Sequence, residues 1–224
     1  MSAVTPETKV IQSISRKSLK GEIVEVLQKA IISGHYKPGD WLVERQLAAE
    51  FAVSTIPVRE ALQELESRGL VKRRPNAGCF VIELSPEEIR QISKLREVLE
   101  PKLIEWAAER ITKEDGEKLQ AQLDLLAKAA KAGDLPHFFY EDSRFHSMVW
   151  QISGNQYAVR ALESAIGPLF AMGLMKGAHP NLPNLVKEVK KHQDFLNALR
   201  AGKVADALRI MAEIARGFDA HLTQ

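Results

Sequence analysis

The sequence predicts a mainly α-helical protein built in two parts, and three observations support this. Apolar residues recur with a helical period over most of the 224 residues. The exception is a pair of short β segments around a Pro75–Gly78 turn, which predicts one hairpin. The whole chain carries +2, but residues 1–80 carry a net +3 and residues 81–224 a net −1. The expected parts are a flexible tail, an N-terminal domain and a helical domain, over residues 1–17, 18–83 and 84–224.

Composition excludes several classes of protein. With 45% hydrophobic and 27% charged residues, the chain can form a core and is not of a disordered type. Cys79 is the single cysteine, which excludes an intramolecular disulfide and a cysteine-built zinc site and fits a reducing compartment. The most apolar segment, 165–175, is broken by Gly167–Pro168 and falls short of the ~18 residues that a membrane span needs. We therefore expect a cytoplasmic protein without membrane contact.

The N-terminal domain reads as a DNA-binding unit. In order, its expected elements are helices at about 18–34, 43–51 and 54–68 and β segments at 70–74 and 79–83. Only three residues separate the second helix from the third, so they are joined by a tight turn. Two helices joined in this way and followed by a hairpin form a winged helix-turn-helix. The second helix of such a pair enters the major groove.

The third helix has an apolar and a polar face. The apolar positions are Val58, Ala61, Leu62 and Leu65. Thr55, Arg59 and Gln63 follow each other at intervals of four, so they share the face that can meet DNA. Ser54 is expected to cap the helix where free N–H groups favour a phosphate. Arg59 suits guanine or phosphate, and the Asn76–Gly78 turn of the wing allows close approach to the duplex.

The C-terminal part reads as six antiparallel helices. They are expected at about 85–110, 112–133, 134–153, 155 to beyond Gly167–Pro168, 183–201 and 203–221. Ser85, Pro86 and Glu88 form the start of a capping box, and Pro101 and Pro168 are expected to bend their helices. Bundles of this kind place ligand sites inside, on facing side chains.

Four polar residues interrupt the apolar faces of these helices. Asp142 and His146 stand four apart and therefore point the same way. His192 and Arg96 each lie on an apolar stripe of another helix. A buried guanidinium is costly unless it is paired, so Arg96 suggests an anionic partner.

These residues leave alternatives open. An aspartate and two histidines can hold Zn²⁺, Ni²⁺ or Mn²⁺ with positions left free, and a small carboxylate would suit a site between such an ion and Arg96. The simpler reading makes each histidine a hydrogen-bonded core residue and pairs Arg96 with Glu100, one turn on.

The N-terminal domain resembles the GntR family of bacterial transcription factors. The motifs that carry the resemblance are Pro38-Gly39-Asp40-Trp41-Leu42, Leu47-Ala48, Val53-Ser54, Pro57-Val58-Arg59-Glu60-Ala61-Leu62, Leu65-Glu66, Gly69-Leu70-Val71 and Gly78-Cys79-Phe80-Val81. The resemblance implies DNA contacts from Arg45, from the helix start at Ser54 and Thr55, from Arg59, and from the wing at Gly78. The family commonly has Ser-Arg-Thr-Pro where this chain has Ser54-Thr55-Ile56-Pro57, so its usual operator need not transfer unchanged.

The C-terminal part resembles the shorter FCD effector domain of the FadR-type subfamily. The motifs are Leu95-Arg96-Glu97-Val98-Leu99-Glu100, Asp142-Ser143-Arg144-Phe145-His146, Ser153-Gly154-Asn155, and His192 with Ala198-Leu199-Arg200-Ala201-Gly202. The resemblance implies an effector cavity with Arg96 and Asn155, and metal ligands at Asp142, His146 and His192. The family's fourth ligand position is Ile214 here, and His221 lies two turns further along. We therefore expect a three-ligand site, a site completed by His221, or a metal-free pocket.

Taken together, these features predict a ligand-responsive transcriptional regulator, and a repressor in particular. It would bind a palindromic operator as a homodimer, with a small organic acid in the bundle changing its DNA affinity. One rival is a metal-dependent enzyme or metal sensor using Asp142, His146 and His192, although no HExxH, GxSxG, P-loop or GxGxxG motif is present. A second rival is a module whose winged helix binds protein or RNA.

Overall fold

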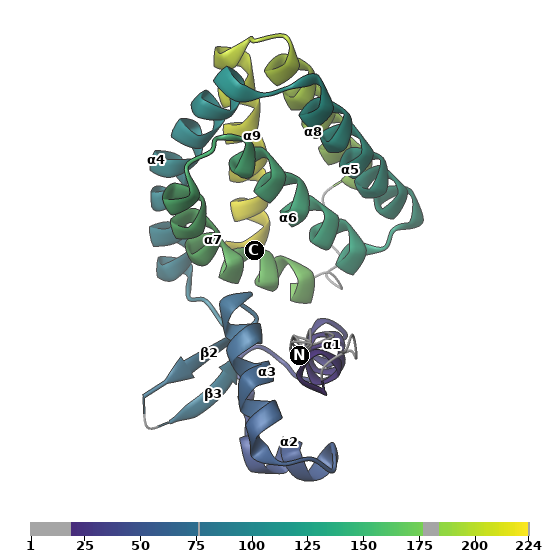
Figure 1. Ribbon diagram of the computed structural model, residues 1–224, viewed down its shortest axis with the longest axis vertical. Helices are drawn as coiled ribbons and strands as arrows, with labels where there is room; N and C mark the ends of the chain where they lie inside the picture. The colour runs from purple at the N-terminus through teal and green to yellow at the C-terminus, as the bar shows by residue number, and fades with distance from the viewer. Residues whose placement is uncertain (1–18, 76, 177–183, 224) are drawn as a thin grey trace, which may run out of the picture.

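The computed structural model describes residues 19–75, 77–176 and 184–223, and two groups of helices are separated by a short linker (Figure 1). The predicted tail at 1–17 and the wing residue Asn76 lie outside the described residues. The N-terminal elements are α1 (Leu19–Ile32), β1 (Trp41–Leu42), α2 (Glu44–Glu50), α3 (Thr55–Ser67), β2 (Val71–Arg74) and β3 (Gly78–Val81). The C-terminal elements are α4 (Pro86–Arg110), α5 (Lys113–Ala132), α6 (Leu135–Ile152), α7 (Gln156–Lys176), α8 (Leu185–Arg200) and α9 (Val204–Thr223). The predicted mainly α-helical fold class is confirmed.

The N-terminal domain is a winged helix-turn-helix, as predicted. The apolar residues of α3 are fully buried, at 0% exposure: Val58, Ala61, Leu62 and Leu65. α3 packs on α1 and α2, and the antiparallel sheet has the order β1-β3-β2. The strand β1 was not predicted from the sequence. Two residues show no period-2 pattern, and β1 exists because Trp41 pairs with Phe80 of the hairpin.

The C-terminal domain is a helical bundle whose ends follow the capping signals. Ser85 and Thr112 each form a capping box, with Glu88 and Asp115, and Asp134 caps α6. Around the bundle, α5 packs on α6 and α8, and α4 packs on α6, α7 and α9. Both proline-containing helices, α4 and α7, run without interruption through Pro101 and Pro168. The local bends expected at these prolines stay predictions.

The two domains touch where α3 ends and α7 passes (Figure 1). Gly69 follows α3 with φ +75°, a conformation that favours glycine. A Cβ atom on Gly69 would lie 2.5 Å from both the carbonyl carbon of Gly167 and the nitrogen of Pro168. Backbone therefore meets backbone at this interface, and no side chain fits at position 69.

The apolar helix α7 is longer than the segment 165–175 that was expected from the sequence to be broken at Gly167–Pro168. Its segment Gln156–Met175 has a mean hydropathy of 1.3 over 20 residues, which is long and apolar enough to cross a membrane by composition alone. Half of that segment is buried inside the fold. A helix in the core of a bundle shows the same pattern, because its apolar residues face neighbouring helices.

Candidate functional site

The exposed face of α3 carries the residues that were predicted to meet DNA. Thr55 begins the helix, and the Arg59 side chain is 55% exposed. Ser54 occupies the N-cap position, but its side chain makes no capping hydrogen bond, contrary to the sequence prediction. Its hydroxyl and the first N–H groups of α3 therefore remain available to a phosphate. Ile56 is 64% exposed beside them.

Two further predicted contacts flank this helix. Arg45 is exposed on α2. Gly78 has φ +103°, and a Cβ atom there would lie 2.5 Å from Nε1 of Trp41, so only glycine fits. Next to it, the Arg74 guanidinium lies 4.7 Å from the centre of the Phe80 ring. Arg45, α3 and the wing base thus offer exposed cations and closely approachable backbone.

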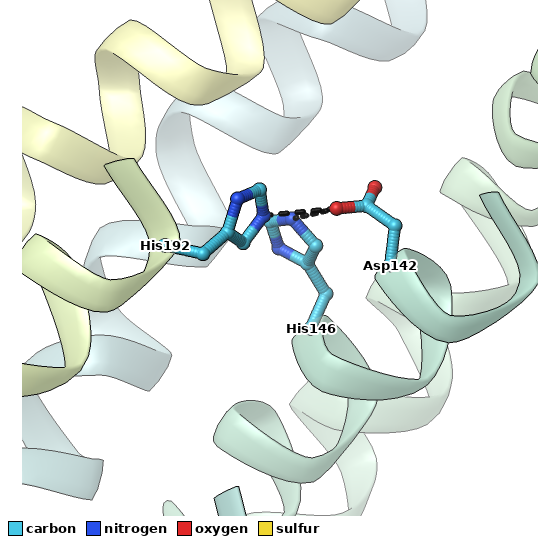
Figure 2. Close-up of side chains that lie close together, drawn as sticks. All are labelled: Asp142, His146 and His192. Atoms are coloured by element: carbon cyan, nitrogen blue, oxygen red, sulfur yellow. Dashed lines mark ion pairs between the residues drawn. The ribbon is translucent and has the colours of Figure 1, made fainter. Parts of the chain in front are cut away.

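A second candidate site lies inside the bundle, where three predicted residues converge (Figure 2). Asp142 and His146 project from α6 and His192 from α8, and one ligand atom from each lies within 4.8 Å of the others. All three are buried, at 5%, 1% and 1% exposure. The fold therefore brings His192 to two residues that precede it by 46 and 50 positions in the sequence.

A hydrogen bond of the His192 ring aims that histidine at the carboxylate. Nδ1 of His192 lies 2.8 Å from the carbonyl oxygen of Glu188, and because a carbonyl only accepts, Nδ1 carries the proton. In the neutral ring Nε2 is then a bare acceptor, and it lies 2.9 Å from Oδ1 of Asp142. Nε2 of His146 faces the same oxygen at 4.0 Å. Such converging acceptors fit a cation between them, and Nε2 of His192 is buried without a hydrogen-bond partner in the part of the chain that the structure describes.

Glu100 lies on the other side of His146. Nδ1 of His146 lies 3.3 Å from Oε1 of Glu100, which also accepts a hydrogen bond from Nε1 of Trp150 at 3.1 Å. Carboxylates in this position orient metal-binding histidines in many proteins. From the sequence, Glu100 was expected only as a partner of Arg96. Its place on the same helical face as Arg96, one turn on, was the available signal.

Arg96 pairs with Glu100, as the simpler sequence reading held. Nε of Arg96 donates to Oε2 of Glu100 at 2.8 Å, and one terminal nitrogen donates to Oε1 at 3.3 Å. The other terminal nitrogen, Nη1, is buried without a hydrogen-bond partner among the described residues. Arg96 also lines a cavity of about 90 Å³ between α4 and α9, with Ser93, Met211 and Asp219. The guanidinium is thus both paired and able to bind a further acceptor.

Ionisation follows from this packing. Burial would raise the pKa of Glu100, but the Arg96 guanidinium and His146 outweigh it and hold that pKa at about 2. Burial lowers the pKa of His146. Burial would also lower the pKa of His192, but the Asp142 carboxylate outweighs it and the pKa is raised. His146 is therefore neutral, and a proton competes with any metal ion mainly at His192.

Two further positions were expected from the resemblance, Ile214 and His221, and the structure describes the side chain of the first alone. Ile214 is 4% exposed and lines a small cavity of about 40 Å³ beside Asp142 and His192. Its side chain supplies no ligand atom. The side chain of His221 lies outside what the structure describes. Within the described residues, the cluster therefore has three candidate ligands.

The structure places Asn155 away from the interior cavities. Its side-chain oxygen accepts a hydrogen bond from the N–H of Ala158 at 3.1 Å, which caps α7. It lines a different surface depression, with Trp106, Arg110 and Tyr157. The expected grouping of Asn155 with Arg96 around one effector is not what the fold builds, because capping α7 fixes Asn155 at the end of that helix.

Comparison with known proteins agrees with both domains. Residues 91–217 match the FCD domain family, and residues 19–81 match the family of bacterial regulatory proteins called the gntR family. The chain belongs to the GntR family. This regulator is 33% identical over 210 residues to the gluconate operon transcriptional repressor of Bacillus licheniformis, covering 92% of this chain and 84% of the relative.

Two further comparisons each cover most of the chain. The HTH-type transcriptional repressor RspR of Escherichia coli K12 is 29% identical over 179 residues, covering 80% of this chain and 78% of the relative. The solved structure of E. coli McbR/YncC superposes with a TM-score of 0.72 at 27% identity, covering 92% and 97% of the two chains. This GntR-family protein is a DNA-binding transcriptional regulator and not an enzyme, which sets aside the metalloenzyme alternative.

Proposed function

We propose that this regulator is a cytoplasmic repressor that binds a palindromic operator as a homodimer. A small organic acid bound in the bundle changes its affinity for DNA. The observation that carries the proposal is the polar interior of the bundle, where Arg96 keeps a buried Nη1 beside a cavity and three ligand atoms converge nearby. The relative named for the gluconate operon is consistent with control of organic-acid genes.

We further propose that Asp142, His146 and His192 hold a divalent ion, either Zn²⁺, Ni²⁺ or Mn²⁺. Carboxylate oxygen and imidazole nitrogen suit these metals, and three protein ligands leave coordination positions open. When bound, the ion would act as a Lewis acid toward a carboxylate oxygen. Arg96 would bind another oxygen through its unpartnered nitrogen, while Glu100 orients His146.

The contact between α3 and α7 supports coupling of the two domains. Phe170 lies one turn after Gly167 in α7, and its ring centre is 5.7 Å from that of His146. Gly167 in turn packs against Gly69 at the end of the DNA-binding helix. A ligand that shifts α7 would therefore move the surface on which the end of α3 packs. The coupling free energy between two such linked sites is typically about 1–3 kcal/mol.

Dimerisation would place two DNA-binding helices on one operator, which a palindromic site requires. Leu95 and Val98 lie three apart on α4 and are 43% and 67% exposed. Apolar side chains at this spacing form one exposed strip, and a second copy of the chain would cover it.

The proposal is tested by a gel shift on the DNA upstream of the protein's own gene, with and without Zn²⁺ and a panel of small carboxylic acids. A sequence-preferring shift that an acid weakens supports it. Response to Zn²⁺ alone would favour the metal-sensor alternative, for which the three-ligand cluster is the evidence. Absence of any sequence preference would overturn the proposed function.

A further inference from the structure

A carboxylate lies between the predicted DNA-contacting Arg59 of α3 and Arg73 of the wing. Glu44 is the first residue of α2, and its side chain is 27% exposed. DNA binding depends on neutralising phosphates with cations, so an acid at this place opposes binding by its charge. The contacts of Glu44 supply a reason for its presence.

Glu44 binds Arg59 in a way that leaves the end of the guanidinium pointing outward. Nε of Arg59 donates to Oε2 of Glu44 at 2.9 Å. Guanine and phosphate are bound best by two parallel N–H groups of one guanidinium edge. With Nε engaged by Glu44 and the side chain 55% exposed, the edge formed by Nη1 and Nη2 is the one that can face DNA.

The same carboxylate faces a second arginine, from the wing. A terminal nitrogen of Arg73 lies 3.7 Å from Oε1 of Glu44 and donates to the carbonyl oxygen of Arg59 at 3.2 Å. The Arg73 N–H also donates to Glu66 on α3, at 3.0 Å. Glu44 and Arg73 therefore tie α2, α3 and β2 together around Arg59, and Arg73 is bound to the protein instead of extending to DNA.

We propose that Glu44 is a positioning residue for sequence-specific DNA recognition, which acts by fixing the orientation of Arg59. The inference rests on the proposed DNA-binding function and not on any metal or effector. A free arginine loses side-chain freedom when it binds a base, whereas one held beforehand loses less. Fixing one such side chain changes affinity by about 3- to 10-fold.

Charge and positioning predict opposite results when Glu44 is removed. If Glu44 acted only through its charge, Glu44→Ala would tighten binding to every duplex, because a repulsion is lost. If it positions Arg59, Glu44→Ala weakens binding to the operator and leaves binding to a scrambled duplex unchanged or tighter. The ratio of the two affinities therefore separates the two roles.

The experiment measures fluorescence anisotropy of the full-length protein with operator and scrambled duplexes. Glu44→Ala should lower the ratio of affinities about 3- to 10-fold. Glu44→Gln keeps an oxygen that accepts from Nε of Arg59, so it should retain most of the ratio. Glu60→Ala is the matched control, since it removes an exposed acid next to Arg59 in sequence that makes neither of the ion pairs of Glu44.

A double-mutant cycle tests whether the effect of Glu44→Ala depends on Arg59 or comes from a general change of structure. If Glu44 acts through Arg59, then adding Glu44→Ala to Arg59→Ala leaves the ratio unchanged. A further fall of the ratio in the double variant would overturn the inference, as would an unchanged ratio in Glu44→Ala alone. A wild-type protein that does not distinguish the two duplexes would overturn the proposed function and the inference with it.

Discussion

Two networks of arginine and glutamate in this regulator use the same side chains in opposite surroundings. On the DNA-binding surface, the Arg59 and Glu44 side chains are 55% and 27% exposed. In the bundle, the Arg96 and Glu100 side chains are 2% and 5% exposed. Exposed pairs contribute about 0–1 kcal/mol because water and salt screen them, whereas breaking a buried pair costs several kcal/mol. The surface network can therefore serve recognition with little effect on folding, and the buried network must serve both folding and the interior site.

The largest expected effect comes from breaking the buried pair. Glu100→Ala leaves Arg96 buried without its partner and removes the contacts to His146 and Trp150. We expect the free energy of unfolding to fall by about 3–5 kcal/mol, measured by urea denaturation. Glu87→Ala is the control, because it breaks an exposed pair with Arg90 on the same helix and should leave stability unchanged. Equal effects of the two substitutions would contradict the comparison.

The pKa of Glu100 adds a pH dependence whose sign is fixed. Its folded value of about 2 lies below the ordinary value of 4.5, so the ionised form stabilises the folded state above about pH 4.5. This contribution is lost as the pH falls from 4.5 toward 2. The wild type should therefore lose more stability over that range than Glu100→Ala, in acid titrations followed by circular dichroism.

The next largest effect on stability is expected from adding a metal ion to the buried cluster. Zn²⁺ at about 100 times its dissociation constant should stabilise the folded protein by about 2.7 kcal/mol. His192→Ala should lose this stabilisation, in thermal unfolding with and without metal. A rise in stability that persists in His192→Ala would place the ion elsewhere.

The effect of Zn²⁺ should also depend on pH. Burial lowers the pKa of His192, but the Asp142 carboxylate outweighs burial and raises that pKa above its ordinary value of 6.5. Protons compete with the ion below the raised pKa, so stabilisation by Zn²⁺ should grow as the pH rises. Without metal the sign reverses. Protonated His192 stabilises the fold below pH 6.5, and this contribution is lost as the pH rises through the raised pKa.

The contact between the domains predicts a smaller but specific effect. Gly69→Ala places a Cβ atom against the backbone of Gly167 and Pro168, whereas Gly34→Ala has a similar positive φ of 78° and open space around it. The difference between the two variants isolates the clash, which we expect to cost about 1–3 kcal/mol more. Gly69→Ala should also lose any effect of bundle ligands on DNA binding, in the gel shift. Loss in both variants would assign the effect to backbone strain instead.

The smallest effect on stability is expected from the surface network, together with a large effect on binding. Arg59→Ala should change the free energy of unfolding by less than about 0.5 kcal/mol. Operator binding should nevertheless weaken by about 1–3 kcal/mol. The salt dependence of binding distinguishes a phosphate contact, which lowers the slope by about one ion, from a base contact, which leaves it nearly unchanged. Unchanged affinity would show that Arg59 does not meet DNA.

Sequence reasoning was most accurate where one local signal decides the structure. The serine, threonine and aspartate caps at Ser85, Thr112 and Asp134 located helix starts, and the spacing of four between Asp142 and His146 gave their common face. Such features depend on residues that are near in sequence, so the period of the helix is enough to place them.

The errors have a common physical cause, which is that tertiary contacts decided the outcome. β1 forms only because Trp41 pairs with Phe80, and Glu100 lies beside His146 only because α4 packs on α6. The interior role of Asn155 was carried over from a motif, but its side chain caps α7. The tie between Glu44 and Arg59 joins residues 15 positions apart on different helices, and no local pattern signals it.

The central claim is that the bundle interior controls the affinity of α3 for DNA. It is tested most directly by measuring operator affinity with and without Zn²⁺ and a pool of small carboxylic acids, for the wild type and His192→Ala. The account predicts a change of about 5- to 150-fold in the wild type and little or none in His192→Ala. Equal operator affinity under both conditions, in a wild type shown by dialysis to bind the ion, would contradict it.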